Sequence, residues 1–144
     1  MSNGKRNRAK GRRFEDRVYE DLRNNGWTVT RTSFNVENDK LIKAKYSPFN
    51  HWTGYPDFIA FKQTEVLLTE YNNEELFGNM NMCYVVIGIE CKGGEKYNNY
   101  LDKNEKEKAK YLLKKNIISR LFIAIKENGK IVYKEFKYEN GDNE

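Results

Sequence analysis

The sequence predicts an α/β domain built on a mixed central sheet of about five strands flanked by helices, with its elements in the order αβββαββ. Three observations support this fold class. The N-terminal third has apolar residues at helical spacing. Short apolar runs at 58–61 and 84–89 have the length and composition of buried strands. Finally, Asn128-Gly129 separates two further strand-like runs, and this dipeptide is a strong hairpin signal.

The chain has 144 residues and no linker-like stretch, so we expect a single domain with one core. That domain should cover residues 10–138, followed by a polar tail at 139–144. Residues 1–9 are polar, basic and free of apolar anchors, which predicts a disordered leader. The first helix follows the leader and should end at Asn24-Asn25-Gly26. Its apolar stripe consists of Phe14, Val18 and Leu22.

Alternation of aromatic or β-branched residues with polar ones predicts a first strand at 27–33, with Arg31 at its end. Residues 34–54 are too polar and too many for an ordinary connection, so we expect an insertion there. Its aromatic and basic side chains suit base stacking and phosphate binding, although the aromatics could instead pack onto the domain. A second insertion, acidic and rich in asparagine, is expected near 63–82.

A second helix is expected at about 102–115, because Asp102 suits the N-cap and Glu105 occupies the matching position of a capping box. Two strands should follow at 121–126 and 130–136, joined by the Asn-Gly turn.

The net charge of +5 and the isoelectric point of about 9.1 suggest a polyanionic partner, because basic residues cluster on the two expected helices. Such clusters can neutralise phosphates, although a solvated basic surface would look the same. The candidate DNA contacts on the helices are Arg12, Arg13, Arg17, Lys103 and Lys106.

Composition also excludes some classes. No apolar run is long enough for a membrane span, and the basic N-terminus lacks the apolar core of a signal peptide. The two cysteines lie in or beside an expected core strand, where burial is the simpler role, so we expect an intracellular, cytoplasmic protein. We expect no small-molecule cofactor.

Charged residues stand at the ends of two expected core strands. Asp57 directly precedes the strand at 58–61, and Glu90 and Lys92 end the run at 84–92. Side chains alternate along a strand, so Glu90 and Lys92 share one face and Cys91 lies on the other. Two carboxylates side by side make an oxygen site that suits Mg²⁺ or Mn²⁺. Taken singly, Asp57 could equally be a turn residue, and Glu90 and Lys92 could equally lie on the exposed face of an edge strand.

Pro56-Asp57 followed by Glu90-Cys91-Lys92 resembles the signature of PD-(D/E)XK nucleases. The N-terminal third resembles archaeal Holliday-junction resolvases, which carry a glutamate early in the first helix, then a glycine, an aromatic residue and a strand-ending arginine. The matching positions are Glu15, Gly26, Trp27 and Arg31.

The resemblance implies a restriction-endonuclease-like core and a Mg²⁺-dependent endonuclease, with Mn²⁺ as a substitute metal. The implied metal ligands are Glu15, Asp57, Glu90 and the backbone carbonyl of Cys91. Lys92 would lie beside the attacked phosphate, and Arg31 and Ser33 would position the scissile strand. The implied substrate is branched DNA, cut by paired nicks in recombination or repair. Cutting two opposed strands implies a homodimer. An archaeal or viral origin agrees with the resemblance.

The chain departs from the compact resolvases in two ways. Those proteins carry an arginine directly after the helix glutamate, whereas here Asp16 follows and Arg17 comes next. Their connections are also shorter than the segments at 34–54 and 63–82. Both departures leave the expected site residues in place and bear on substrate choice. Another structure-specific or nicking endonuclease, or a catalytically inert nucleic-acid-binding module, therefore stays open.

Overall fold

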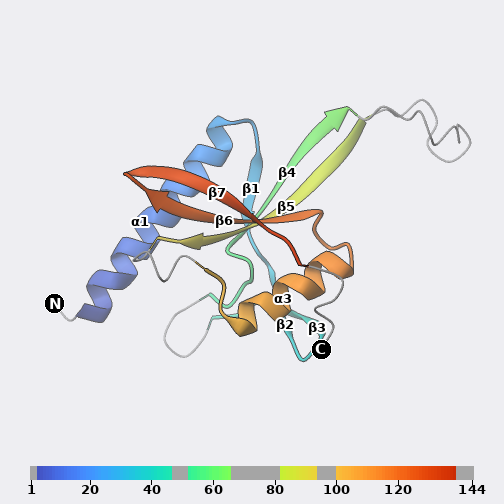
Figure 1. Cartoon of the computed structure of the whole chain (residues 1–144), viewed down its shortest axis with the longest axis horizontal. Helices are drawn as coiled ribbons and strands as arrows, with labels where there is room; N and C mark the ends of the chain where they lie inside the picture. Colours follow the sequence, from blue (N-terminus) through green and yellow to red (C-terminus); the bar gives the residue numbers. More distant parts are fainter. Residues whose placement is uncertain (1–2, 47–51, 66–81, 94–99, 139–144) are drawn as a thin grey trace, which may run out of the picture.

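A mixed five-stranded sheet with the strand order β1-β4-β5-β6-β7 forms the centre of the molecule (Figure 1). The computed structural model describes residues 3–46, 52–65, 82–93 and 100–138. Its elements are α1 (Asn3–Asn24), β1 (Thr28–Arg31), β2 (Phe34–Glu37), β3 (Lys40–Lys43), β4 (Phe58–Glu65), β5 (Met82–Lys92), α3 (Lys103–Lys114), β6 (Arg120–Glu127) and β7 (Lys130–Phe136). The α/β class and the mixed five-stranded sheet are thus confirmed.

Strand β5 lies at the middle of the sheet. It pairs with β4 in antiparallel and with β6 in parallel orientation, while β1 and β7 pair antiparallel at the two edges. A parallel neighbour requires a crossover, and α3 supplies it between β5 and β6. Because both faces of β5 are covered, its sequence is apolar from Val85 to Ile89 apart from one glycine, as expected for a central strand.

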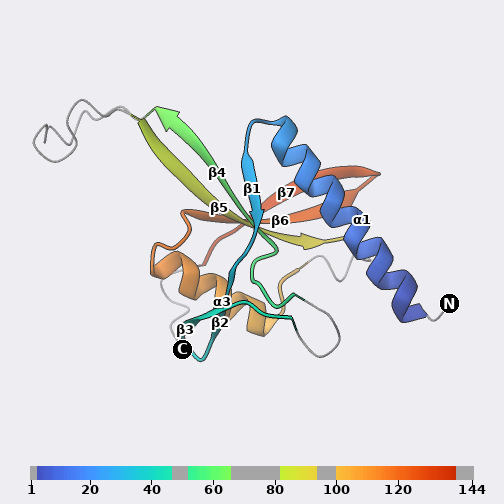
Figure 2. The same ribbon diagram turned by 180° about the vertical axis from the view of Figure 1, so that it is seen from behind.

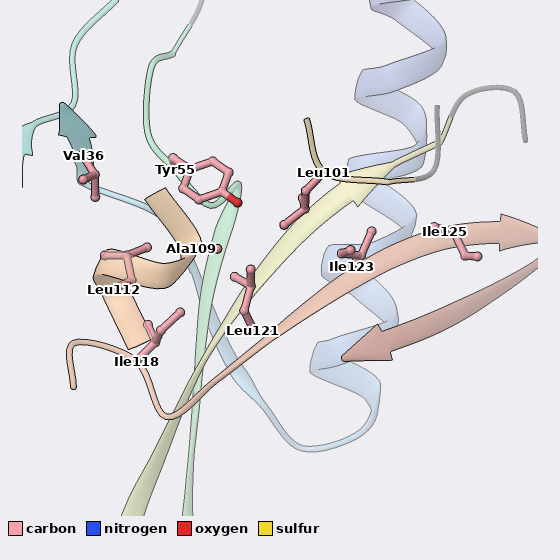
Figure 3. Close-up of a cluster of buried hydrophobic side chains, with 9 residues drawn as sticks. All are labelled: Val36, Tyr55, Leu101, Ala109, Leu112, Ile118, Leu121, Ile123 and Ile125. Carbon is pink, nitrogen blue, oxygen red and sulfur yellow. The ribbon is translucent and has the colours of Figure 1, made fainter. Parts of the chain in front are cut away.

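Helices α1 and α3 cover opposite faces of the sheet, as both Figure 1 and Figure 2 show. The stripe of α1 packs against Phe58, Ile87 and Ile89. On the other face, Ala109 and Leu112 of α3 pack against β6. Figure 3 shows this second cluster, which consists of Val36, Tyr55, Leu101, Ala109, Leu112, Ile118, Leu121, Ile123 and Ile125.

Helix α1 begins earlier than the sequence predicts. Residues 3–9, expected to belong to a disordered leader, are helical and continuous with the rest of α1. The prediction of a leader rested on the lack of apolar anchors, whereas a helix can extend outward from a segment that is itself anchored. The first buried residue of the helix is Phe14.

The first expected insertion contains a hairpin that the sequence analysis missed. Strands β2 and β3 form a separate two-stranded sheet, turned at Asn38 and Asp39, which both have positive φ angles. Asparagine and aspartate tolerate this conformation, but the pair lacks the glycine that usually marks such a turn. Val36 is buried in the cluster under α3, so the hairpin packs on the domain.

The remaining boundaries are close to those expected. Helix α3 has Asp102 as its N-cap and a complete capping box with Glu105. The β6–β7 turn has positive φ angles at Asn128 and Gly129, as a two-residue hairpin requires. Strands β4 and β5 are longer than expected, which shortens the second insertion to residues 66–81. That segment, the tail at 139–144 and residues 1–2 lie outside the described residues.

The turn that carries Asp57 is fixed by contacts with the end of β1. The Trp52 indole Nε1 donates a hydrogen bond to the Thr32 carbonyl oxygen at 2.7 Å, and the Thr32 amide donates to the Asp57 carbonyl at 3.3 Å. The Tyr55 amide donates to the Phe34 carbonyl at 2.9 Å. Trp52, in the first expected insertion, and Tyr55, just after it, therefore serve packing, whereas Tyr46 is 70% exposed.

Substituting Gly54 should loosen this turn. A Cβ atom there would overlap the Thr32 carbonyl oxygen and lie 2.7 Å from the Trp52 indole nitrogen. Gly54→Ala is therefore expected to lower the free energy of unfolding by about 1–3 kcal/mol, the usual range for overpacking. Urea unfolding measures it. Gly11→Ala is the control, because a Cβ there meets nothing within 4 Å. Equal stability of the two variants would contradict the packing described.

Candidate active site

Asp57 and Glu90 meet at the end of the β4–β5 pair. Phe58 pairs with Ile89 in the antiparallel register, so Asp57, one residue earlier, falls opposite Glu90. Directly opposed residues of antiparallel strands have neighbouring side chains. The Asp57 Oδ2 atom accepts a hydrogen bond from the Cys91 amide at 2.8 Å, which fixes the orientation of the carboxylate. The Asp57 carboxylate acts directly on Glu90 and raises its pKa.

Glu90 is a buried carboxyl group with an unmet hydrogen-bonding need. Its side chain is 6% exposed, and its Oε2 atom has no hydrogen-bond partner among the described residues. Burial, followed by the charge and hydrogen bond of Asp57, raises the pKa of Glu90 well above its usual value. Burying an unpaired carboxylate is costly. Such a group is normally paired or bound to a metal. This agrees with the expectation that Glu90 is a metal ligand.

Glu15 approaches the same place from α1. Burial and the charge of Asp57 raise the pKa of Glu15, while its contact with Arg31 partly offsets the increase. The Arg31 Nη2 atom lies 3.2 Å from Glu15 Oε2. The guanidinium also lies over the Phe58 ring, 5.3 Å from its centre. The helix glutamate and the strand-ending arginine, expected separately from the sequence, are thus ion partners.

Lys92 is held by a residue that the sequence analysis assigned only to a helix cap. The Lys92 Nζ atom donates to both carboxylate oxygens of Glu105, each at 2.7 Å. Burial alone would lower the pKa of Lys92, but the hydrogen bonds and charge of Glu105 raise it. Glu105 also accepts from the Asp102 amide, and its own carbonyl accepts from the Tyr55 hydroxyl at 3.1 Å. Glu105 therefore joins the start of α3 to the candidate site.

The Lys92–Glu105 pair should be energetically coupled. Its side chains are only 22% and 16% exposed, so little water screens the contact. A double-mutant cycle with Lys92→Met and Glu105→Gln, followed by urea unfolding, should give a coupling energy of about 1 kcal/mol or more. Glutamine keeps the capping box.

The control cycle uses Glu20 and Arg23 on α1, which lie 3.8 Å apart and are more than half exposed. That pair should give about 0.5 kcal/mol or less. If both cycles gave the same small value, Glu105 would not hold Lys92 in solution.

Two further residues named by the sequence prediction are Cys91, in β5, and Ser33, between β1 and β2. Cys91 faces the α1 side of the sheet, opposite Glu90 and Lys92, as strand alternation predicts. It is a free cysteine, and burial raises the pKa of its thiol. Its carbonyl as a metal ligand stays a prediction. Ser33 is exposed, and its carbonyl accepts from the Ala44 amide at 3.0 Å.

The expected DNA contacts on the two helices lie on opposite sides of the sheet. Arg12, Arg13 and Arg17 are exposed on α1, on one side of the sheet, and Arg17 donates to the Gly129 carbonyl at 2.9 Å. Lys103 and Lys106 are exposed on α3, which covers the other side. Arg31, at the end of β1, is the only one of the expected contacts that the described structure pairs with a site carboxylate.

A divalent cation would relieve the repulsion that Asp57 exerts on Glu15 and on Glu90. The described residues contain no group of three or more His, Cys, Asp or Glu side chains already arranged as a metal site. Asp57 nevertheless raises the pKa of both Glu15 and Glu90, so its carboxylate lies within electrostatic reach of each of them. Carboxylate oxygens are the donors that Mg²⁺ prefers. The carboxylates of Glu15, Asp57 and Glu90 therefore suit this cation by their chemistry. In the described structure, Arg31 is the ion partner of Glu15.

A separate groove of about 400 Å³ lies between the β2–β3 turn and α3, lined in part by Glu37, Asp39 and Glu107. It includes none of the expected site residues. Within the described ranges, no helix is long and apolar enough to cross a membrane.

Comparisons of the chain with protein-family models, curated proteins and solved structures give no match. Its function must therefore be inferred from its residues and their geometry.

Proposed function

We propose that this chain is a Mg²⁺-dependent, structure-specific DNA endonuclease of the PD-(D/E)XK kind. The observation that carries the proposal is the approach of three carboxyl groups from three elements to one end of the sheet. Glu15 comes from α1, Asp57 precedes β4, and Glu90 ends the apolar run of β5. Lys92 shares the face of Glu90. A site of this composition suits hydrolysis of a phosphodiester bond without a covalent intermediate.

Asp57 and Glu90 would hold Mg²⁺ or Mn²⁺, with Glu15 completing the site. When bound, the ion lowers the pKa of water and offsets the negative charge that develops on the phosphate. Asp57 is preorganised for this role, because one of its oxygens is fixed by the Cys91 amide. Glu90 offers the buried oxygen that lacks a partner in the described structure.

Lys92 would donate hydrogen bonds to the attacked phosphate and orient the water. The ammonium lies near both Glu90 and Glu105, so its charge is positioned before substrate arrives. Such preorganised charge stabilises a transition state without reorganising at the moment of reaction. Arg31, the ion partner of Glu15, ends β1, and Ser33 follows two residues later. Both would contact the scissile strand.

The proposed substrate is a four-way junction, resolved by paired nicks. A junction has two opposed strands to cut, and one site cannot cut both symmetrically. The working form would therefore be a homodimer with two-fold symmetry. The basic residues of α1 and α3 would supply most of the affinity through phosphate contacts.

The decisive experiment offers purified protein and Mg²⁺ a panel of labelled DNAs: four-way junction, fork, flap, duplex and single strand. The expected result is a dimer that nicks opposed strands of the junction and prefers it strongly over duplex of the same sequence. Affinity should fall steeply with salt, while the preference for junctions persists because it depends on shape. Absence of metal-dependent nicking on every substrate would favour an inert binding module.

A second candidate is another structure-specific or nicking endonuclease with the same chemistry. Asp16 favours it, because the acidic side chain stands where compact resolvases have arginine. The β2–β3 hairpin also favours it, as an added element between β1 and the Asp57 turn. A monomer that cuts forks or flaps in preference to junctions would decide for this candidate.

A further inference from the structure

The first turns of α1 project away from the domain. Residues 3–13, which we call the basic arm, precede Phe14, the first buried residue of the helix. Every residue of the arm whose burial is described is exposed, except the half-buried Ala9. A Cβ atom added at Gly11 would meet nothing within 4 Å. Figures 1 and 2 show these turns extending past the sheet, beside no other described element.

The arm carries its cations on two stripes. Residues three or four apart share a side of a helix, so Arg6, Lys10 and Arg13 form one stripe. Arg8 and Arg12 form the other, and three residues later this second stripe reaches Glu15 at the candidate site. Apart from a weak contact of Arg8 with the Gly4 carbonyl at 3.4 Å, the described structure gives the side chains of these stripes no partner.

In water, the arm is a poor helix on its own. Like charges stand four residues apart at Arg6 and Lys10 and again at Arg8 and Arg12, which destabilises a helix. The first turn contains no acidic residue to balance the positive end of the helix dipole. Gly4 and Gly11 lower the helix propensity further. A polyanion along both stripes would remove the repulsion.

We propose that the basic arm docks as a helix in the major groove of a duplex arm of the substrate, next to the scissile phosphate. This inference rests on the proposed function. Two cationic stripes suit a groove, whose two rows of phosphates flank an inserted helix, better than a single strand with one row. At 1.5 Å per residue the arm is about 16 Å long, enough to follow about five base pairs. The major groove is wide enough to admit a helix.

Charge on the arm should set duplex affinity and its salt dependence. Binding is measured by fluorescence anisotropy on a duplex of roughly two helical turns, without divalent ions, so no cleavage occurs. Arg8→Gln/Arg12→Gln and Arg6→Gln/Lys10→Gln should each weaken binding and reduce the slope of log affinity against log salt by about 2. The control Lys126→Gln/Lys134→Gln removes the same charge from exposed residues of β6 and β7, outside the arm and both helices, and should leave the slope nearly unchanged.

Helical structure in the arm should affect duplex affinity even when the charge of the arm is unchanged. Gly11→Ala raises helix propensity without a clash and should strengthen duplex binding up to about fivefold. Ala9→Pro interrupts the arm and should weaken it. Far-ultraviolet circular dichroism should show helix gained when duplex is added to the wild type but not to Ala9→Pro. Urea unfolding of both variants should match the wild type, because the arm lies outside the core.

The outcomes separate this inference from the proposed function. If both arm variants bind duplex like the wild type, or if single-stranded DNA shows the same loss of affinity and slope, the groove-binding arm is wrong. If charge matters but Gly11→Ala and Ala9→Pro change nothing, the arm binds without forming a helix, which also overturns it. Cleavage that survives these results leaves the nuclease proposal standing. Arm-dependent duplex binding without any cleavage supports the arm and contradicts the nuclease.

Discussion

Asp57→Asn and Glu90→Gln are each expected to reduce Mg²⁺-dependent DNA cleavage by about 10³-fold or more. Each change removes one carboxylate from the opposed pair at the β4–β5 end while keeping a side chain of the same shape. Affinity for DNA without metal should stay within about twofold, because phosphate contacts on the basic surfaces supply most of the binding. Lys92→Ala should lose cleavage in the same way. Single-turnover cleavage and anisotropy, measured on the same DNA, separate the two effects.

Glu127→Gln is a matched control, since this exposed carboxylate at the end of β6 lies outside the site. It should cleave like the wild type. Cleavage that persists in both Asp57→Asn and Glu90→Gln would place the chemistry elsewhere in the chain. Loss of DNA binding in these variants, in parallel with cleavage, would mean that the carboxylates support the fold or the interface and not the reaction.

The pairing of Asp57 with Glu90 could be expected from the sequence because it depends on local rules. Strand alternation puts Glu90 and Lys92 on one face, and an antiparallel neighbour opened by Asp57 brings the carboxylates together. Helix α3 was likewise predictable, since Asp102 and Glu105 form a local capping box.

Other contacts between segments have no such pattern in the sequence to predict them. Glu105 reaches Lys92 because the fold brings the first turn of α3 near the end of β5, so the cap residue becomes a site residue. The β2–β3 hairpin has Asn38 and Asp39 at its turn, and without glycine this pair is common in ordinary loops. The position of Val36 in the core helps to explain why the hairpin is stable.

Glu90→Gln is also expected to make the protein more stable near neutral pH. Burial and the neighbouring Asp57 raise the pKa of Glu90 in the folded state. As pH rises past about 4.5, the unfolded chain releases this proton while the folded protein retains it, so the wild type loses stability until the folded pKa is passed. Glutamine does not titrate and has no such loss. The variant should gain about 1–3 kcal/mol near pH 7, and the difference should vanish below about pH 4.

Glu135→Gln provides a control of opposite sign. The pKa of Glu135 is lowered by its hydrogen bonds and charge interaction with Arg120, so this carboxylate adds stability above its unfolded pKa. Its replacement should therefore destabilise the protein near neutral pH, and the difference should close as pH falls through the folded pKa. Urea unfolding of both variants and the wild type over about pH 3.5–7.5 tests the two signs together.

Addition of Mg²⁺ tests whether a metal ion bound at Glu90 stabilises the folded protein. An ion that binds only the folded state stabilises it by mass action, so the wild type should gain stability with Mg²⁺ concentration near neutral pH. Glu90→Gln should gain little, because it lacks the buried oxygen that has no partner in the described structure. Glu135→Gln should respond like the wild type. If Glu90→Gln were less stable than the wild type near neutral pH, the Glu90 carboxylate would already be stabilised by its surroundings. The folded protein would then gain nothing by placing a cation there, and the carboxyl pair would lose the physical reason for binding metal.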